Sequence, residues 1–315
     1  MAFYLYAAGS GGKSVVDYKR KIGYHQLLSQ YAERKALLEW VDYLREHPEC
    51  KCKLFVDSGA YTAHTKGVDI DVDEYIKLIN DITDQVTVFA QVDKIPGRWG
   101  QPKTVEQVMS APKESWDNYL YMVNKIKEPQ KLLPIFHQGE DFKWLENMIN
   151  YQYTEGPLKG KYIEYIGISC NKELSSKEWI PWFEKCFETI RNSNNPNVKT
   201  HAFGMTSLKI IEQFPFTSSD STTWLKFAAY GSILIKGKPY YISNRNELGE
   251  KHIESLTPQV KEEIIKELNR LGFKYEDVLN DEKGDMRLLV NLASLKDWCD
   301  NYEYKGSLDT KTELW

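Results

Sequence analysis

The 315-residue sequence has no apolar run approaching the roughly 18 to 20 residues that a helix needs to cross a bilayer. Its first residues, Met-Ala-Phe-Tyr-Leu-Tyr-Ala-Ala-Gly, also lack the basic segment with which a secretory signal begins. Hydrophobic residues make up 42% of the chain and charged residues 27%, which is typical of a soluble globular protein. We therefore expect a cytoplasmic protein with no membrane partner.

Cysteine is scarce, and its distribution argues against both a disulfide framework and a zinc site. The five cysteines are an odd number and are scattered along the chain, which favours reduced thiols. Cys50-Lys-Cys52 is a C-x-C pair, but no second Cys/His cluster follows it at zinc spacing. We expect no metal site.

Nucleotide-binding glycine motifs are also missing. No Gly-x-Gly-x-x-Gly follows an expected strand, which argues against a dinucleotide fold. The segment Gly9-Ser-Gly-Gly-Lys-Ser14 lacks the first glycine that a phosphate-binding loop requires before Gly-Lys-Ser. We read it as a flexible loop after the first strand, and we expect no cofactor.

Positive charge is not in excess, since the net charge is −4. This excludes a protein that coats nucleic acid through a global basic field, but it permits a local basic track. Lys94, Arg98 and Lys103 surround Trp99, and cations interleaved with an aromatic ring suit phosphates and unstacked bases. A solvated loop with Trp99 folded back on the protein is the alternative.

Strand-like and helix-like segments alternate along most of the sequence, which predicts repeated βα units and a parallel sheet. About eight such units in roughly 235 residues match the usual size of a (β/α)₈ barrel. We therefore predict an α/β protein with a TIM-type barrel over residues 1–240 and a C-terminal helical extension over residues 241–315. The expected strands cover residues 3–8, 54–58, 87–92, 132–137, 163–169, 199–203, 215–220 and 226–235.

Polar residues end four of these expected strands, as in barrels whose strand ends feed an active site. The segments are Phe55-Val-Asp57-Ser58-Gly59, Phe89-Ala-Gln-Val-Asp93, Ile135-Phe-His137-Gln138-Gly139 and Phe216-Thr-Ser-Ser-Asp220. A single Asp after a strand is as often a turn residue or a helix cap. The hypothesis therefore depends on the whole set.

Base exchange at a nucleoside C1′ is a reaction that needs such a set. One carboxylate can trap the sugar covalently while the base leaves, and a second group must move a proton. A third carboxylate can accept hydrogen bonds from the N1–H and N2–H₂ donors of guanine. We assign the first role to Asp220, because its polar Thr-Ser-Ser-Asp-Ser-Thr-Thr segment can hold a carboxylate ionised, and the second role to Asp57; Asp93 is the third carboxylate of the set. Because three neighbouring carboxylates repel each other, at least one should have a raised pKa.

The order of these motifs resembles the tRNA-guanine transglycosylase superfamily, including its DNA-modifying relatives that insert 7-deazaguanines. Asp57-Ser58-Gly59-Ala60-Tyr61-Thr62 stands where that family has Asp-Ser-Gly-Gly-Phe-Gln, and Gln138-Gly139-Glu140 stands where it has Gln-Gly-Gly. Gly167 is what remains of a Gly-Gly-Leu motif. The resemblance implies that Asp220 is the nucleophile and Asp93 reads the base. It also implies that Ser58, Gly59, His137, Gln138, Gly139 and Gly167 bind substrate.

The resemblance covers about residues 1–235 and includes two departures. The family's Cys-x-Cys-x-x-Cys…His zinc module is absent, and the chain is shorter than the tRNA enzymes. Both departures favour DNA over tRNA as the polynucleotide partner, with a 7-deazaguanine base as the incoming group. A tRNA-directed transglycosylase, an N-glycosidase acting on nucleosides or nucleotides, and a non-catalytic barrel that binds a modified base are the alternatives.

Overall fold

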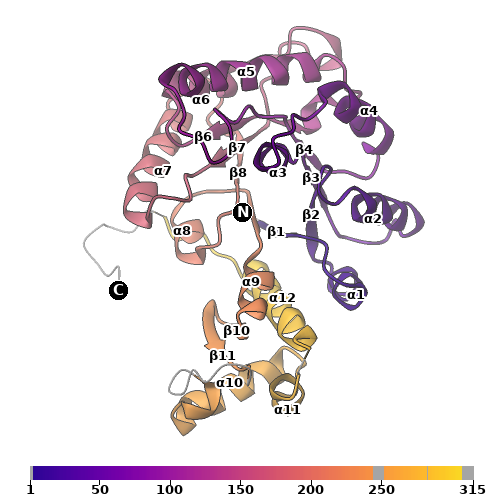
Figure 1. The fold of residues 1–315 in the computed structure, drawn as a ribbon, viewed down its shortest axis with the longest axis vertical. Coiled ribbons are helices and arrows are strands. Elements are labelled where there is room, and N and C mark those ends of the chain that lie inside the picture. Colours follow the sequence, from indigo (N-terminus) through magenta and orange to yellow (C-terminus); the bar gives the residue numbers. More distant parts are fainter. Residues whose placement is uncertain (1–2, 244–251, 282, 307–315) are drawn as a thin grey trace.

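The computed structural model describes residues 3–243, 252–281 and 283–306. A nearly closed sheet of parallel strands forms its centre, with helices around it (Figure 1). The strands of this sheet are β1 (Tyr4–Ala8), β2 (His25–Ser29), β3 (Leu54–Asp57), β4 (Val88–Ala90), β5 (Leu132–Leu133), β6 (Ile135–His137), β7 (Tyr165–Ser169), β8 (Lys199–Ala202) and β9 (Ser218–Ser221).

The order of the strands is β5-β4-β3-β2-β1-β9-β8-β7-β6, so the first strand lies between the second and the last. Only Pro134 separates β5 from β6, and these two segments pair with β4 and β7 at opposite edges of the sheet. The Gly167 N–H also donates to Pro134 O at 2.7 Å. The two segments thus act as one strand position, and the predicted (β/α)₈ barrel is confirmed.

Helices follow the strands in alternation and pack around the barrel (Figure 1). Most match the expected amphipathic segments. In α4, the side chain of Asp71 accepts a hydrogen bond from Glu74 N and so caps the first turn. The helices around the barrel are α1 (Lys13–Lys21), α2 (Arg34–Glu46), α3 (Ala60–Thr65), α4 (Val72–Ile82), α5 (Val105–Val123), α6 (Phe142–Asn150), α7 (Ser176–Arg191), α8 (Leu208–Gln213) and α9 (Thr223–Ala229).

The sequence-based prediction missed β2 and placed the eighth strand wrongly. Residues 226–235 run from α9 into β10 (Ser232–Ile235), which pairs antiparallel with β11 (Lys238–Tyr241) outside the barrel. The missing strand is His25-Gln-Leu-Leu-Ser29. Its Gln26 is buried, and a polar residue at a buried position breaks the apolar pattern from which strands were predicted. The amide of Gln26 donates to Ala7 O and Leu27 O at 2.7 Å each, which satisfies a polar group inside the protein.

The expected flexible loop after the first strand is also shorter than predicted, because α1 begins at Lys13. Lys19 of this helix is fully buried, and its ammonium group donates to Gly9 O at 2.8 Å and Ser10 O at 3.1 Å. The same ammonium donates to the Gln26 side chain at 2.8 Å. These hydrogen bonds fix the glycine-rich loop against β2.

A C-terminal helical extension follows the barrel, as predicted, and includes α10 (Pro258–Arg270), α11 (Tyr275–Leu279) and α12 (Asp285–Asp300). With β10 and β11 it encloses a second apolar cluster, which includes Ile233 and Leu268, and the hairpin and α10 form a lobe beside the barrel in Figure 1. Helix α12 returns to the barrel, where it packs against β1 and α1. None of the described helices is long and apolar enough to cross a membrane.

The inside of the barrel is filled by side chains that alternate with those facing the helices. Tyr6, Phe55 and Leu133 belong to this inner cluster, whereas their neighbours Leu5 and Leu54 pack in the core between sheet and helices. The same inner cluster includes Ala8, Val88, Ala90 and Ile135, so the barrel interior is a packed core and not an open pore.

Candidate functional site

Three aspartates lie at the carboxyl ends of barrel strands, where TIM-type barrels hold their active sites. Asp57 is the last residue of β3, Asp93 follows β4, and Asp220 lies near the end of β9. Tyr6 of β1 is in register with Asp220, and Ser29 of β2 is in register with Asp57. Neighbouring strands therefore bring Asp57 and Asp220 to the same end of the barrel.

Asp57 has a carboxyl group whose pKa is raised. Burial and then the charge of Asp93 raise its pKa to about 7, although the Gly59 N–H donates to Asp57 Oδ2 at 3.0 Å and acts in the opposite direction. The charges of Asp220 and Glu33 add smaller increases. The expectation that one of the neighbouring carboxyl groups has a raised pKa is therefore met at Asp57, which can carry or release a proton near neutral pH.

Asp93 belongs to a chain of three ionisable groups. His137 Nε2 lies 3.1 Å from Asp93 Oδ2, and His137 Nδ1 lies 3.2 Å from Glu140 Oε1. Burial lowers the pKa of His137, but the hydrogen bonds to Asp93 and Glu140 outweigh it and raise the pKa to about 10. His137 is therefore an imidazolium at neutral pH and pairs with one oxygen of Asp93, whose other oxygen, Oδ1, lies outside this ion pair.

Asp220 has a different set of partners. Its Oδ1 accepts a hydrogen bond from Gly204 N at 2.6 Å and lies 3.3 Å from His201 Nε2. His201 is fully buried, and burial lowers its pKa against the opposing effect of Asp220, so it is a neutral imidazole. Its Nδ1 lies 2.5 Å from Ser218 Oγ, and Ser218 also contacts the Tyr165 hydroxyl.

These contacts form a hydrogen-bonded chain that crosses the barrel interior. If Nε2 of the neutral His201 donates to Asp220, then Nδ1 must accept from Ser218, which leaves Ser218 Oγ to accept from Tyr165. The chain orients the Asp220 carboxylate and leaves Oδ2 outside these contacts. Asp220 is thus held in one orientation, as a nucleophile requires.

Ser58 and Gly59, which we expected to bind substrate, shape the turn that follows Asp57. Gly59 has φ +77°, and a Cβ there would lie 2.5 Å from Tyr31 Cβ, so the turn requires glycine. Ser58 is buried, and its carbonyl accepts from Gln30 Nε2 at 3.0 Å. Ser58 and Gly59 therefore have a structural role: they form the turn between β3 and α3, which orients the Asp57 side chain.

Gln138 lies at the same end of the barrel, but both ends of its amide are occupied by backbone. Its Nε2 donates to Glu178 O at 3.3 Å, and its Oε1 accepts from Asn171 N at 3.0 Å. Gly139, which follows it, has φ +106° and is exposed. In this arrangement Gln138 braces the loop after β7.

Gly167 lies inside the barrel in β7, where a Cβ would come within 2.5 Å of the Phe203 ring and 2.8 Å of Leu133 Cδ2. The aromatic ring of Phe203 therefore needs glycine at this position. Packing accounts for Gly167, and this structure gives it no polar contact with the carboxylates.

The expected basic loop lies between β4 and α5, on the same side as the aspartates. Lys94 Nζ lies 3.5 Å from Asp69 Oδ1, and the backbone N–H of Lys94 donates to Ser115 Oγ at 2.8 Å. Arg98, Trp99 and Lys103 are exposed, and the Trp99 ring lies against the Tyr61 ring of α3, so both the basic-track interpretation and the alternative of a solvated loop with Trp99 folded back on the protein stay open.

A pocket of about 330 Å³ adjoins Asp93 between α3 and α5. Its lining is mixed: besides the apolar residues Val68, Ile70 and Val92 it includes the charged residues Asp69, Lys94, Glu114 and Asp117. A volume of this size is at the lower end of that of small-molecule sites. The pocket thus gives Asp93 a neighbouring space of small-molecule size.

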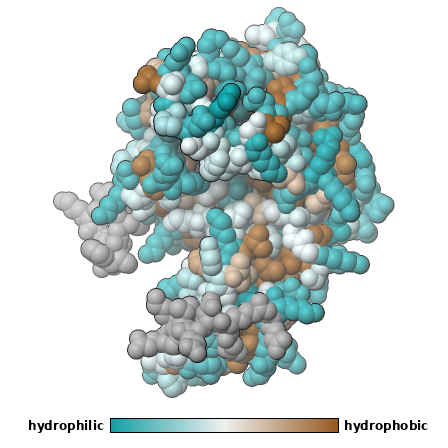
Figure 2. All heavy atoms as spheres, viewed as in Figure 1, coloured by the Kyte–Doolittle hydropathy of each residue, from teal (hydrophilic) through white to brown (hydrophobic). Residues whose placement is uncertain are grey.

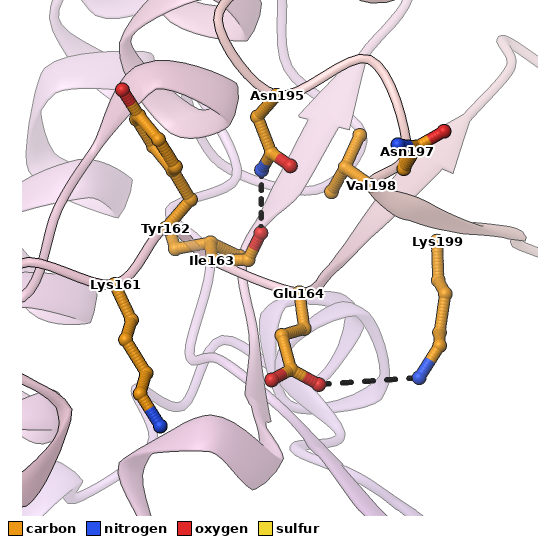
Figure 3. Close-up of a pocket in the computed structure, with 8 residues that line it drawn as sticks. All are labelled: Lys161, Tyr162, Ile163, Glu164, Asn195, Asn197, Val198 and Lys199. Carbon is orange, nitrogen blue, oxygen red and sulfur yellow. Dashed lines mark hydrogen bonds and ion pairs between the residues drawn. The ribbon is translucent and has the colours of Figure 1, made fainter.

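A second pocket, of about 410 Å³, lies at the opposite end of the barrel (Figure 3). Asn195 Nδ2 donates to Ile163 O at 2.7 Å across it, and Glu164 Oε2 lies 4.0 Å from Lys199 Nζ. These residues precede or begin β7 and β8. Because chemistry in such barrels occurs at the carboxyl ends of the strands, we do not assign the site here.

Five residues of the site were not predicted from the sequence: Glu140, Tyr165, His201, Gly204 and Ser218. Glu140 could have been found, because it follows His137 by three residues. The other four belong to different strands and a loop, and they meet only when the barrel closes. Among the described residues, no group of three or more His, Cys, Asp or Glu side chains is arranged to hold a metal ion.

Comparison with known proteins adds no assignment to this geometry. No protein-family model matches the chain, and no curated protein matches it. The function must therefore be argued from the site itself.

Proposed function

We propose that the protein is a base-exchanging transglycosylase that replaces guanine in a polynucleotide, DNA in preference to tRNA, by a 7-deazaguanine base. The observation that carries this proposal is the different environment of each aspartate at one barrel mouth. Asp57 has a raised pKa, Asp93 is ion-paired with His137, and Asp220 is oriented by Gly204 and His201. Environments that separate carboxylates in this way suit distinct acid/base and nucleophilic roles.

In the proposed reaction, Asp220 attacks C1′ of the target nucleotide as the bond from C1′ to the base nitrogen breaks. The electron pair of that bond goes to the base, and the proton of neutral Asp57 goes with it. The incoming base then gives a proton to ionised Asp57 while its nitrogen displaces the Asp220 ester. Each step balances, and Asp57 returns to its starting state.

Asp93 supports selection of guanine because it is fixed as a hydrogen-bond acceptor. The His137 imidazolium takes one carboxylate oxygen, and the other can accept from the N1–H and N2–H₂ donors of guanine. Adenine presents an acceptor at N1, which would face this carboxylate unfavourably. A site that hydrogen-bonds one base edge rejects an analogue that lacks the donors.

The test is to trap the covalent intermediate. Incubation with a guanine-containing oligonucleotide and no incoming base should give a protein–oligonucleotide adduct on a denaturing gel. Asp220→Asn should abolish the adduct, because an amide cannot form the ester. An undiminished adduct in this variant would disprove the assignment.

Parallel incubations separate the alternatives. Single-stranded DNA, duplex DNA and tRNA identify the polynucleotide, and a labelled 7-deazaguanine shows whether the base is exchanged. Release of guanine without incorporation of the label identifies an N-glycosidase, in which water replaces the incoming base. Binding of the modified base with no adduct and no release would identify a non-catalytic barrel.

A further inference from the structure

Two exposed aromatic rings touch each other beside the site. Tyr61, on α3, and Trp99, in the loop before α5, have ring centroids 5.8 Å apart and planes at 84°. Tyr61 is 61% exposed and Trp99 is 57% exposed. Exposed rings of this size retain apolar surface in water, which a stacking partner would cover.

Both rings lie in segments that directly follow strands of the site. Tyr61 is the second residue of α3, which follows Asp57 at the end of β3, and Trp99 lies in the loop after β4 that also contains Asp93. The same two segments line the pocket beside Asp93, through Ala60 and Ile95. The ring pair is therefore part of the rim of the proposed site.

Positive charges accompany the ring pair. Arg98 and Lys103 lie in the same loop as Trp99 and are exposed, and neither has an ion-pair partner among the residues that the structure describes. A Cβ at Gly97 would lie 3.0 Å from Lys103 Cγ, so the stem of Lys103 runs along the loop next to Arg98. Unpaired cations around aromatic rings match the charge and chemistry of a nucleic-acid strand.

We propose that Tyr61 and Trp99 form a stacking platform for a base that flanks the target base on a single-stranded polynucleotide. This inference rests on the proposed function, because that function places a nucleotide in the barrel mouth. The flanking base stacks on the exposed ring pair, and its phosphates face Arg98 and Lys103. The platform keeps the strand open while the target base is extruded into the site.

Stacking also determines how selective the platform is. Every base has a π-face, so stacking tolerates any sequence, and the two rings offer no hydrogen-bond pattern that reads a base edge. The target is then selected inside the barrel, at Asp93, and the platform supplies affinity alone. Duplexes should bind more weakly, because their bases are already stacked on each other.

The test combines abasic oligonucleotides with ring variants. In single-stranded DNA and RNA of one sequence, each nucleotide beside the target guanine is replaced in turn by an abasic residue. One replacement should weaken binding to the wild-type protein about five-fold to one hundred-fold, the range expected for loss of one stacked base. Trp99→Ala and Tyr61→Ala should weaken binding of the intact strand. With the strand whose abasic residue weakens binding to the wild type, the same variants should cause little further loss of affinity.

Trp99→Phe should retain much of the affinity, because it keeps a ring at this position. Tyr230→Ala is the matched control, since Tyr230 is 74% exposed on the C-terminal side of α9, and it should leave binding unchanged. Urea unfolding of each variant confirms that it is folded. The DNA and RNA arms show which polynucleotide the platform prefers.

The outcomes for the platform and for the proposed function are distinguishable. If the Asp220 adduct forms but no flanking abasic residue affects binding, the platform is wrong and the function stands. If a flanking base matters and the ring variants remove its effect while no adduct forms, the platform stands and the transglycosylase assignment fails. Absence of binding to either polynucleotide at low salt contradicts both.

Discussion

At the scale of single residues, neighbours that are remote in sequence determine the chemistry of each aspartate. His137, ion-paired to Asp93 and Glu140, is charged at neutral pH, whereas His201 next to Asp220 is neutral. The positive charge of His137 therefore offsets the charges of two carboxylates, whereas His201 contributes only a hydrogen bond. This difference leaves Asp57 as the group that exchanges protons near neutral pH.

The raised pKa of Asp57 has a consequence for stability that can be measured. Between its ordinary value of 3.8 and about 7, the folded state binds the proton more tightly than the unfolded state, so stability falls as pH rises through this range. Asp57→Asn removes the ionising group. We expect this variant to gain on the order of 4 kcal/mol of unfolding free energy over wild type between pH 4 and pH 8.

Urea denaturation at both pH values measures this gain. The control is Asp17→Asn on the exposed surface of α1, which should show no such dependence on pH. An equal offset of Asp57→Asn at pH 4 and pH 8 would mean that Asp57 titrates normally. The same substitution should stop base exchange, since an amide cannot transfer the proton.

The sequence allowed the three aspartates to be predicted as neighbours because each ends an apolar segment, and parallel strands end at the same side of a barrel. It did not allow His201 or Tyr165 to be included. Their contacts with Asp220 and Ser218 depend on strand register, which is fixed only when β7, β8 and β9 pair. Local sequence carries no information on that register.

At the scale of elements, the loop from Lys94 to Lys103 joins the site to the surface. Replacing Arg98 and Lys103 together by alanine should weaken binding to all polynucleotide sequences alike. Each lost phosphate contact should also lower the slope of log affinity against log salt by about 0.7 for a single strand. Titrations at several salt concentrations measure both effects.

The matched control is the double substitution of Lys159 and Lys161 by alanine. These lysines are exposed, and Lys161 lines the pocket at the opposite end of the barrel. Binding and its salt slope should stay at the wild-type values. A salt slope that is unchanged by loss of Arg98 and Lys103 would show that the loop does not contact phosphates.

Strands and helices were predicted best where their apolar period was regular, as in α4. The two errors, β2 and the segment from 226 to 235, have different causes. In β2, Gln26 occupies a buried position because Lys19 and backbone carbonyls satisfy it, so a real strand looked polar. Residues Ser232–Ile235 have a strand pattern, but they pair with a hairpin partner outside the barrel.

At the scale of the whole molecule, α12 connects the end of the chain to its beginning. The Trp298 ring packs edge-on against Phe3 with centroids 5.7 Å apart, and its Nε1–H donates to Glu212 Oε1 at 3.0 Å. Trp298→Ala should lower the unfolding free energy by about 2 kcal/mol, somewhat less than for a fully buried tryptophan.

Thermal and urea unfolding measure this loss. The control is Tyr304→Ala, which removes a ring that is exposed and lies further along the chain, and it should change stability little. If Trp298→Ala is equally neutral, α12 does not hold the barrel closed. Activity of the folded fraction should be retained, since Trp298 lies away from the three aspartates in sequence and in its contacts.

The position of β1 also constrains the order in which the chain can fold. β1 needs β9 as its second neighbour, and the Trp224 indole N–H donates to Ala8 O across 216 residues of sequence. While the chain is being synthesised, one edge of the first strand therefore stays unpaired until about two thirds of the protein has emerged. Strand pairings between residues far apart in the sequence slow folding, and an unpaired strand edge can pair with another chain and cause aggregation. We infer that the nascent barrel closes late, in a single step that joins its first strand to its last.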